Sequence, residues 1–390
     1  MSKLEKQFTK TAYDPLDKRH HGAIHVPIYQ NSLFAFDSYD QFDEAMKAQL
    51  DHHIYSRGNN PTVQYLEMKL ADLEEAESAK CFASGMAAIS SSIMSVVSQG
   101  DHVICVNQAY GPTREFLGSY MSRFGVETSF IDGSSIEEWR SAVRPNTKLF
   151  YLESPTTMYF ELQDLRKCAE LARSIGAVTI IDNTWATPCY QNPTKLGVDL
   201  VVHSITKYIG GHSDCVGGVV LGSKELVERI QNNEYMLLGG IMTPQTAALV
   251  AKGLRTLPLR MQRHEQSGLQ VAEHLVKQSY VTRVNHPGLP SHPQYELGQS
   301  QMSGASSVFS FLSSEPLEKM KEWANRLKYF KIGVSWGGFE SLVTVNRPVS
   351  DEKTSDHSAA IVRLYVGMED PSDLIADINR AWEQVCNPVT

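Results

Sequence analysis

From about residue 78 onward, short apolar runs alternate with segments whose apolar positions recur at helical spacing. Helical segments, for example 85–98 and 164–176, separate the first five runs. The runs are rich in β-branched and aromatic residues and are predicted to be strands at 80–83, 102–106, 126–131, 148–153, 177–182, 199–204 and 216–222. Nearly continuous apolar strands separated by helices predict a mostly parallel sheet with helices on both faces.

The pattern changes after about residue 245. One long helical segment is predicted at 244–278, strands at 307–312, 341–346 and 361–367, and a closing helix at 373–385. The first 55 residues are polar and irregular, which is typical of an arm that lies on something else. We therefore expect an α/β protein with three parts, which are an arm (1–55), a large domain (56–245) and a smaller α+β C-terminal domain (246–390).

Composition narrows the class of partner. The 390 residues include 42% hydrophobic and 21% charged residues, and the net charge of -8 disfavours nucleic acid or an anionic membrane as partner. No apolar run approaches the length of a membrane span, and the start of the chain lacks the apolar stretch of a signal peptide. The six cysteines show no C-x-x-C spacing, so we expect free thiols, no metal site and a cytoplasmic location.

Chemistry in such sheets is expected at the carboxyl ends of the strands. Lys207 follows the apolar run "VDLVV", and Ser204 and Thr206 place hydroxyl groups beside it. A lysine there either extends its ammonium group to the surface or loses its charge and becomes a nucleophile for Schiff-base formation. The sequence around Lys207 alone leaves both interpretations open.

Two further strand ends carry unusual residues. Asp182 ends the run "VTIID", where its carboxylate needs a partner, either a backbone cap, an arginine or a protonated ring nitrogen. Ser84, Gly85 and Met86 stand at a turn from strand to helix, which is either a plain helix cap or a phosphate cradle. One ligand, pyridoxal phosphate, would use the lysine, the acid and the cradle together.

Five motifs together resemble the Cys/Met-metabolism family of enzymes that depend on pyridoxal phosphate. They are "YSRGNNPTVQYLEMKLADLE", "ASGMAAI", "IDNTWATP", "HSITKYIGGHSD" and "IVRLYVGMED", and the resemblance runs from about residue 20 to residue 385. It implies pyridoxal 5'-phosphate as cofactor and a type I PLP-dependent fold, the aspartate-aminotransferase-like fold, with a smaller α+β C-terminal domain.

The resemblance also implies roles for individual residues. Lys207 would form the Schiff base with the cofactor, Asp182 would pair with its ring nitrogen, and Tyr110 would stack on its ring. Arg363 would bind the substrate carboxylate as a planar fork. The phosphate ligands implied in the same chain are Gly85, Met86, Ser204 and Thr206.

A shared site is a further implication of the resemblance. Tyr55 and Arg57, in "YSRGNNPT", match residues that reach the phosphate in a neighbouring subunit, and Tyr55 also borders the substrate. This gives the arm a purpose, and it implies a homotetramer built as a dimer of dimers.

The expected reaction is elimination from a sulfur amino acid, in which Lys207 removes the Cα proton and Lys207 or Tyr110 protonates the leaving sulfur. Ser335 and Trp336, in "VSWGGFESL", resemble the substrate-side segment of bacterial cystathionine β-lyases, whereas the γ-acting members usually have S-L-G-G. We therefore expect β-elimination of cystathionine or cysteine S-conjugates to thiol, pyruvate and ammonia. The alternative is a γ-acting member, namely cystathionine γ-lyase, cystathionine γ-synthase or methionine γ-lyase.

Other positions modify this expectation. Pro112 stands where methionine γ-lyases typically have a cysteine, and Glu340 occurs in both β- and γ-acting members. Thr157 and Met158 replace the Asn-Pro that most members have, which leaves the hydrogen bonding near the cofactor's phenolic oxygen open. The rival classes are a non-enzymatic relative, which the retained lysine, aspartate and arginine disfavour, and a nucleotide-dependent enzyme, which the missing glycine fingerprints disfavour.

Overall fold

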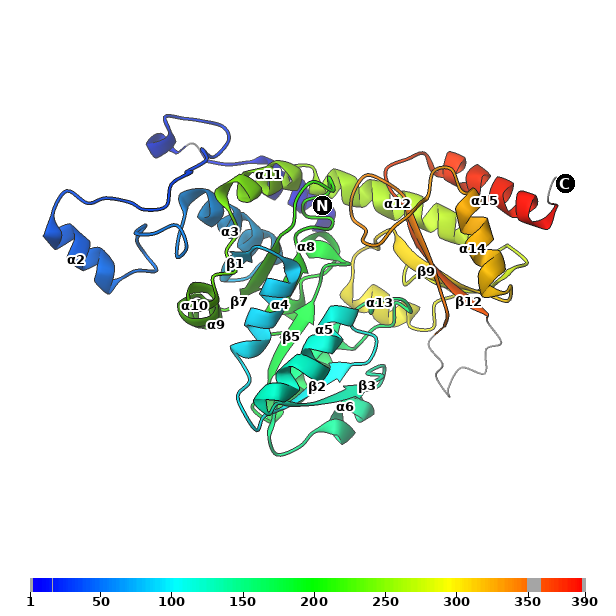
Figure 1. Ribbon diagram of the computed structural model, residues 1–390, viewed down its shortest axis with the longest axis horizontal. Coiled ribbons are helices and arrows are strands. Elements are labelled where there is room, and N and C mark those ends of the chain that lie inside the picture. Colours follow the sequence, from blue (N-terminus) through cyan, green and yellow to red (C-terminus); the bar gives the residue numbers. More distant parts are fainter. Residues whose placement is uncertain (1–2, 16, 349–358, 388–390) are drawn as a thin grey trace.

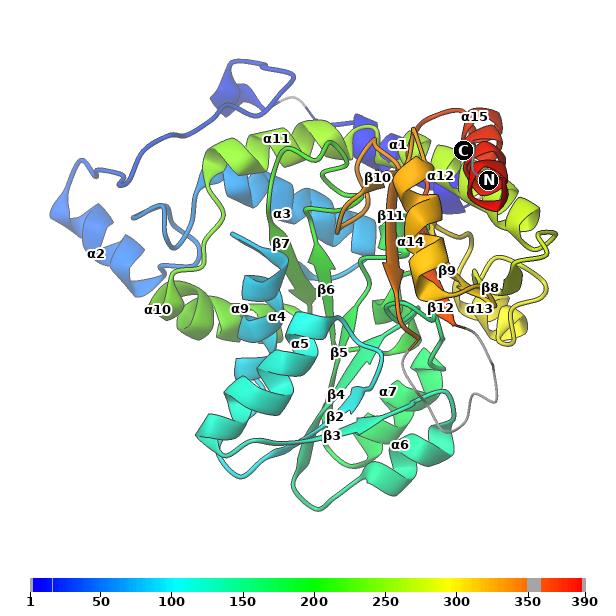
Figure 2. The same cartoon turned by 45° about the vertical axis from the view of Figure 1, so that its right-hand side comes forward.

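Two β-sheets with surrounding helices make up the fold, seen in the computed structural model, which describes residues 3–15, 17–348 and 359–387 (Figures 1 and 2). The larger sheet has seven strands in the order β1-β7-β6-β5-β4-β2-β3. Its strands are β1 (Ser78–Phe82), β2 (His102–Val106), β3 (Glu127–Ile131), β4 (Thr147–Glu153), β5 (Val178–Asp182), β6 (Leu200–Ser204) and β7 (Gly218–Gly222).

The larger sheet is mostly parallel, as predicted. Strands β3, β2, β4, β5 and β6 pair in parallel, and only β7 runs antiparallel to both of its neighbours. Every residue of β2 is buried, as expected for a strand with helices on both faces. The helices around this sheet are α3 (Pro61–Glu74), α4 (Gly85–Met94), α5 (Gly111–Glu115), α6 (Ile136–Ala142), α7 (Leu165–Ser174), α8 (Thr187–Tyr190), α9 (Lys224–Ile230) and α10 (Met236–Leu238).

The second sheet has five strands in the order β10-β11-β12-β9-β8, and all its pairs except β10–β11 are antiparallel. Its strands are β8 (Val281–Asn285), β9 (Val308–Ser313), β10 (Lys331–Ile332), β11 (Leu342–Asn346) and β12 (Ala360–Tyr365), and the helices α13 (Tyr295–Gln301), α14 (Leu317–Arg326) and α15 (Pro371–Cys386) accompany it. The expected strands at β9, β11 and β12 are present. The sequence pattern missed β8, whose "VTRVN" has polar residues at three of five positions and lies at the edge of the sheet.

The long segment predicted as one helix is two helices, α11 (Pro244–Leu254) and α12 (Leu257–Leu275). Pro258 lies in the first turn of α12. N–H groups in a first turn have no acceptor within the helix, so a proline there costs no hydrogen bond. One continuous helix would have placed the same proline in its interior, where it breaks the hydrogen-bond ladder. The expectation of an uninterrupted helix was therefore wrong.

The arm is less irregular than expected, because it contains α1 (Lys3–Ala12) and α2 (Tyr39–Lys47). Helix α1 packs on α3, α8 and α12, and the Gln7 side-chain amide donates to the Pro188 carbonyl at 3.2 Å. Asp14 then pairs with Lys69 at 2.7 Å and with Arg255 at 2.6 Å. Beyond this anchor the chain leaves the body of the molecule and carries α2 outward (Figures 1 and 2). The domain limits at 55 and 245 remain predictions.

Four strands of the larger sheet, β1, β4, β5 and β6, have their carboxyl ends along the same edge of the sheet. Glu153 at the end of β4 is the register partner of Asp182 at the end of β5, and β6 ends beside them at Ser204. The turn from β1 into α4 lies near the same edge, because α4 packs on both β6 and β7. Among the described residues, no helix is long and apolar enough to cross a membrane.

Candidate active site

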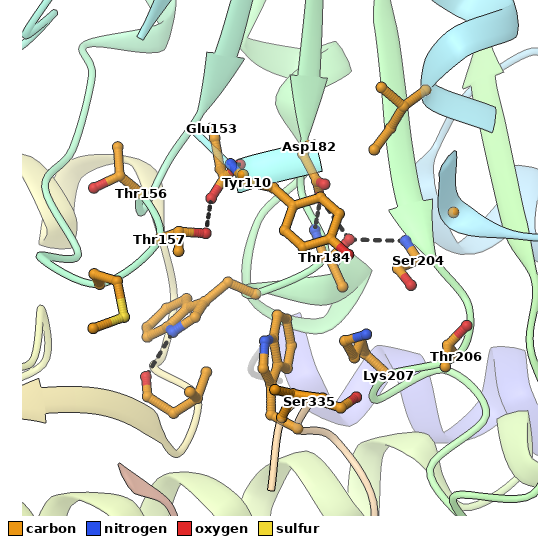
Figure 3. A pocket seen from close by; sticks show the side chains of 18 of the residues that line it. Tyr110, Glu153, Thr156, Thr157, Asp182, Thr184, Ser204, Thr206, Lys207 and Ser335 are labelled. Atoms are coloured by element: carbon orange, nitrogen blue, oxygen red, sulfur yellow. Dashed lines mark hydrogen bonds between the residues drawn. The ribbon is translucent and has the colours of Figure 1, made fainter. Parts of the chain in front are cut away.

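A cavity of about 620 Å³ opens at this edge, between the larger sheet and the second sheet (Figure 3). It brings together residues from distant parts of the chain. The predicted site residues that line it are Gly85, Met86, Tyr110, Asp182, Ser204, Thr206, Lys207, Ser335, Trp336 and Arg363. Tyr55 and Arg57 are not among the lining residues.

One side of the cavity is a cradle at the N-terminus of α4. The Ser84 hydroxyl accepts a hydrogen bond from the Ala87 N–H at 3.0 Å and so caps the helix. A Cβ on Gly85 would lie only 3.0 Å from the Ser204 hydroxyl oxygen, so the backbone and Ser204 approach each other here because residue 85 is glycine. Helix N-termini with this close backbone approach bind phosphate. The cradle therefore fits the phosphate of the predicted cofactor.

Thr206 completes that side of the cavity, and its side chain contacts the backbone of Gly217. Its hydroxyl donates to the Gly217 carbonyl at 3.3 Å and accepts from the Gly217 N–H at 3.1 Å. The long donor contact leaves the hydroxyl able to turn toward an anion, while the N–H contact holds the side chain in place.

Asp182 lies on the cavity floor (Figure 3) and is held by Thr184. The Thr184 N–H donates to Asp182 Oδ1 at 3.0 Å, and the Thr184 hydroxyl donates to the same oxygen while accepting from the Ser204 N–H at 2.8 Å. Burial raises the pKa of Asp182, and the Thr184 hydrogen bonds and the fields of His203 and Lys207 oppose that rise. A ring N–H⁺ placed here would satisfy the carboxylate, so Asp182 fits the pyridine nitrogen of the cofactor.

Lys207 points into the cavity from the loop after β6 (Figure 3). Burial lowers the pKa of Lys207, Asp182 opposes this, and the guanidinium of Arg363 adds to it. An amine whose charge is disfavoured in this way is suited to nucleophilic and base chemistry. The buried Arg260 holds the loop, because its guanidinium donates to the Tyr208 carbonyl at 2.6 Å.

The second sheet supplies the opposite wall. Arg363 stands on β12, its pKa is lowered by burial, and Nη2 donates to the Ser335 carbonyl at 3.5 Å. A Cβ on Gly337 would lie 2.6 Å from the Lys207 carbonyl carbon, so this segment lies directly on the lysine loop. In the same segment, the centroid of the Trp336 ring lies 5.8 Å from Lys207 Nζ.

Trp336 lines the cavity and also packs on Tyr208, with the two ring centroids 5.2 Å apart. Tyr110 lines the cavity at the start of α5, with 43% of its surface exposed. Tyr55 and Arg57 lie together where the arm meets the large domain, with the Arg57 guanidinium carbon 5.1 Å from the Tyr55 ring centroid.

Sequence reasoning missed Glu153 and Thr184. Glu153 ends an apolar strand in "KLFYLE", which is the same signal that singled out Asp182 in "VTIID". The strand order that makes the two acids neighbours was the missing information. Thr184 was missed because its role depends on bridging two strand ends that are far apart in the sequence.

Comparison with known proteins shows which family the chain belongs to. The family described as "Cys/Met metabolism PLP-dependent enzyme" matches residues 9–383, and the chain belongs to this family. Its cofactor is therefore pyridoxal 5'-phosphate, which confirms the prediction from the lysine, the acid and the cradle.

Curated relatives cover almost the whole chain and have different named activities. An L-methionine gamma-lyase of Treponema denticola is 38% identical over 94% of this chain and 94% of that protein. A cystathionine gamma-lyase of Bacillus subtilis is 38% identical, and a cystathionine beta-lyase of Lactococcus lactis subsp. cremoris is 36% identical, each over 93% of this chain and 95% of the relative. These names support a lyase of cysteine and methionine metabolism, and they do not distinguish β- from γ-elimination.

A solved structure confirms the fold prediction. The crystal structure of metB from Corynebacterium glutamicum has a TM-score of 0.88 and 33% sequence identity, over 99% of this chain and 98% of that one. The type I PLP-dependent fold, with a mostly parallel sheet and a second sheet beside it, is thus established for this chain.

Proposed function

We propose that the protein is a carbon–sulfur β-lyase acting on cystathionine or cysteine S-conjugates. The overall change is R–S–CH₂–CH(NH₃⁺)–COO⁻ + H₂O → RSH + CH₃–CO–COO⁻ + NH₄⁺. The observation that carries the β assignment is the bulky Trp336 ring beside Lys207 Nζ, at 5.8 Å. It narrows the cavity next to the reacting atoms and so favours the shorter, three-carbon arm of the substrate.

The bound cofactor supplies an electron sink for carbanion chemistry. This chain's residues do the rest. Arg363 binds the substrate carboxylate, and the Lys207 amine takes the proton from Cα, a role that its lowered pKa supports. Asp182 would hold the ring N–H⁺ of the cofactor, and Lys207 or the hydroxyl of the partly exposed Tyr110 gives a proton to the departing sulfur.

The second candidate is γ-elimination, which would give 2-oxobutyrate in place of pyruvate. What favours it is that several of the curated relatives, at 37–38% identity over almost the whole chain, are named L-methionine gamma-lyase. Incubation of the protein with cystathionine, followed by chromatographic identification of the 2-oxo acid, separates the two. Mainly pyruvate supports the β assignment, and mainly 2-oxobutyrate overturns it.

We further propose a homotetramer whose sites are shared between subunits. The end of the arm supports this, because Tyr55 and Arg57, where the arm meets the large domain, do not line the cavity of their own chain. The arm also exposes large apolar side chains, including Ile24 at 79% and Tyr39 at 83%, which are typical of a surface that another chain covers. None of the six cysteines, all of which the structure describes, is assigned to a disulfide, which supports a cytoplasmic location.

A further inference from the structure

Two carboxyl groups stand side by side on the cavity floor. Glu153 and Asp182 are register partners at the ends of adjacent parallel strands, and both line the cavity (Figure 3). Neighbouring buried carboxylates do not both ionise readily, because each negative charge disfavours the other. One member of the pair is therefore expected to keep its proton.

The surroundings of the two acids differ. Asp182 accepts two hydrogen bonds from Thr184 and lies in the fields of Lys207 and His203, all of which favour its charged form. The groups that act most strongly on Glu153 are Asp182, which disfavours its charge, and the neutral donors Thr157 and Tyr110. Glu153 is thus the member that keeps the proton.

The hydrogen bonds of Glu153 fix where that proton lies. Oε2 is 2.7 Å from the Tyr110 N–H, which can only donate, so Oε2 is an acceptor. Oε1 is 2.6 Å from the Thr157 hydroxyl oxygen, which can donate or accept. A neutral Glu153 therefore carries its proton on Oε1 and donates it to Thr157.

This arrangement frees the hydrogen of the Thr157 hydroxyl. Thr157 lines the cavity, and its N–H donates to the Gln108 carbonyl at 3.0 Å, so backbone and side chain are both held. We propose that Glu153 is a neutral positioning residue whose proton goes to Thr157, so that the Thr157 hydroxyl donates to an anionic oxygen in the cavity. The inference rests on the proposed function of the cavity, and the anionic oxygen belongs either to the cofactor's phenolate or to the substrate carboxylate.

The pH range over which Glu153 keeps its proton depends on the groups around it. Burial, and then the charge of Asp182, raises the pKa of Glu153 to about 8. Tyr151 on the same strand and Cys105 on β2 also lie in the field of Glu153, and burial raises the pKa of each, so both stay neutral. The proton on Glu153 is present below pH 8 and is lost above it, when Thr157 must donate to Glu153 instead.

Infrared difference spectroscopy tests the protonation state directly. The purified protein, with its cofactor and again after its removal, should show the carbonyl band of a buried carboxylic acid at pH 7. That band should disappear in Glu153→Gln and shift in frequency in Thr157→Val. In Asp182→Asn it should be lost at a lower pH than in wild type, because the neighbouring charge that raises the pKa of Glu153 is gone. A spectrum of wild type without a band that depends on Glu153 would overturn the proposal.

Ligand binding tests the role of the hydroxyl. Thr157→Val should weaken either pyridoxal 5'-phosphate, titrated into cofactor-free protein, or L-alanine, a carboxylate without a leaving group, by about tenfold or more. Thr157→Ser should stay within about twofold of wild type. If Thr157→Val binds pyridoxal 5'-phosphate more weakly, the hydroxyl donates to the phenolate, and if it binds L-alanine more weakly, the hydroxyl donates to the carboxylate. Unchanged affinity for both ligands overturns the proposal.

Amide substitution tests the positioning role. Glutamine reproduces a neutral acid, because its carbonyl accepts from Tyr110 and its NH₂ donates to Thr157. Glu153→Gln should therefore bind both probes within about twofold of wild type at pH 7 and keep that binding above pH 8, whereas Glu153→Leu should lose about tenfold or more. Equal loss in both variants would mean that Glu153 acts as a carboxylate, which contradicts the proposal.

The infrared result is independent of the proposed reaction. If Lys207 proved not to bind the cofactor, the band that depends on Glu153 would remain a property of the chain. If Lys207 does bind it and the band is absent, only this inference fails.

Discussion

Replacing Arg363 with alanine gives the sharpest test of how the substrate is held. Arg363 stands on β12 in the second sheet, its pKa is lowered by burial, and the other side of the cavity belongs to the larger sheet. Its contact with the Ser335 carbonyl is long, at 3.5 Å, so most of its donor capacity remains for a ligand. The planar guanidinium suits a carboxylate in a bidentate arrangement.

The expected loss of activity in Arg363→Ala depends on how far the guanidinium charge is buried. Truncating one partner of a buried, hydrogen-bonded charge pair costs about 2–5 kcal/mol, which corresponds to about 30-fold or more in affinity. The carboxylate of a small substrate stays partly hydrated in an open cavity, so we take at least tenfold as the expected loss in kcat/KM. The loss should appear mostly in KM, because the carboxylate is bound equally in the ground and transition states.

Steady-state kinetics on cystathionine, together with the absorbance spectrum of the bound cofactor, measures the effect. Arg363→Ala should keep the cofactor spectrum of wild type, and Arg363→Lys should recover only part of kcat/KM, because an ammonium group lacks the fork. Arg144→Ala is a matched control, since Arg144 forms an exposed ion pair with Glu127 at 2.6 Å and should change kcat/KM by less than about twofold. A value of kcat/KM near wild type in Arg363→Ala would show that another group binds the carboxylate.

Three further predictions concern the wall, the subunit contact and the cradle. Trp336→Leu should raise the share of 2-oxobutyrate over pyruvate, and an unchanged ratio would leave Trp336 with a packing role only. Mixing inactive Arg57→Ala chains with inactive Lys207→Ala chains should restore part of the activity, because one of the hybrid sites has both residues intact. If activity does not recover although subunit exchange is proven, Arg57 belongs to the site of its own chain. Gly85→Ala should weaken cofactor binding by about tenfold, because its Cβ would lie 3.0 Å from the Ser204 hydroxyl, and wild-type affinity in a titration would argue against the cradle.

The sequence predicted the parts of the fold that depend on local pattern. Buried parallel strands such as β2 are nearly continuous apolar runs, and the residues singled out at or just after strand ends, such as Asp182 and Lys207, line the cavity. Their roles toward the cofactor stay predictions. The same reasoning failed for β8, whose five residues are mostly polar because it lies at a sheet edge. It also failed at Pro258, because the apolar pattern continues across this proline although the proline lies in the first turn of a second helix.

The site could be predicted only in part, because its remaining members depend on which strands are neighbours. Glu153 gains its significance from its register with Asp182, and β4 and β5 are adjacent although α7 separates them in the sequence. Thr184 matters because it joins Asp182 to the Ser204 backbone. Neither relation is visible in a periodicity. The positions of Tyr55 and Arg57 relative to a neighbouring subunit stay predictions.

The central claim is that Lys207 is the residue to which the cofactor is bonded. Borohydride reduction of the purified protein, followed by peptide mapping, tests it directly. The pyridoxyl group should be found on the peptide that contains Lys207, and Lys207→Ala should give no labelled peptide and should lower kcat by about 10²–10⁴-fold or more. A pyridoxyl group on any other lysine would contradict the assignment of the whole site.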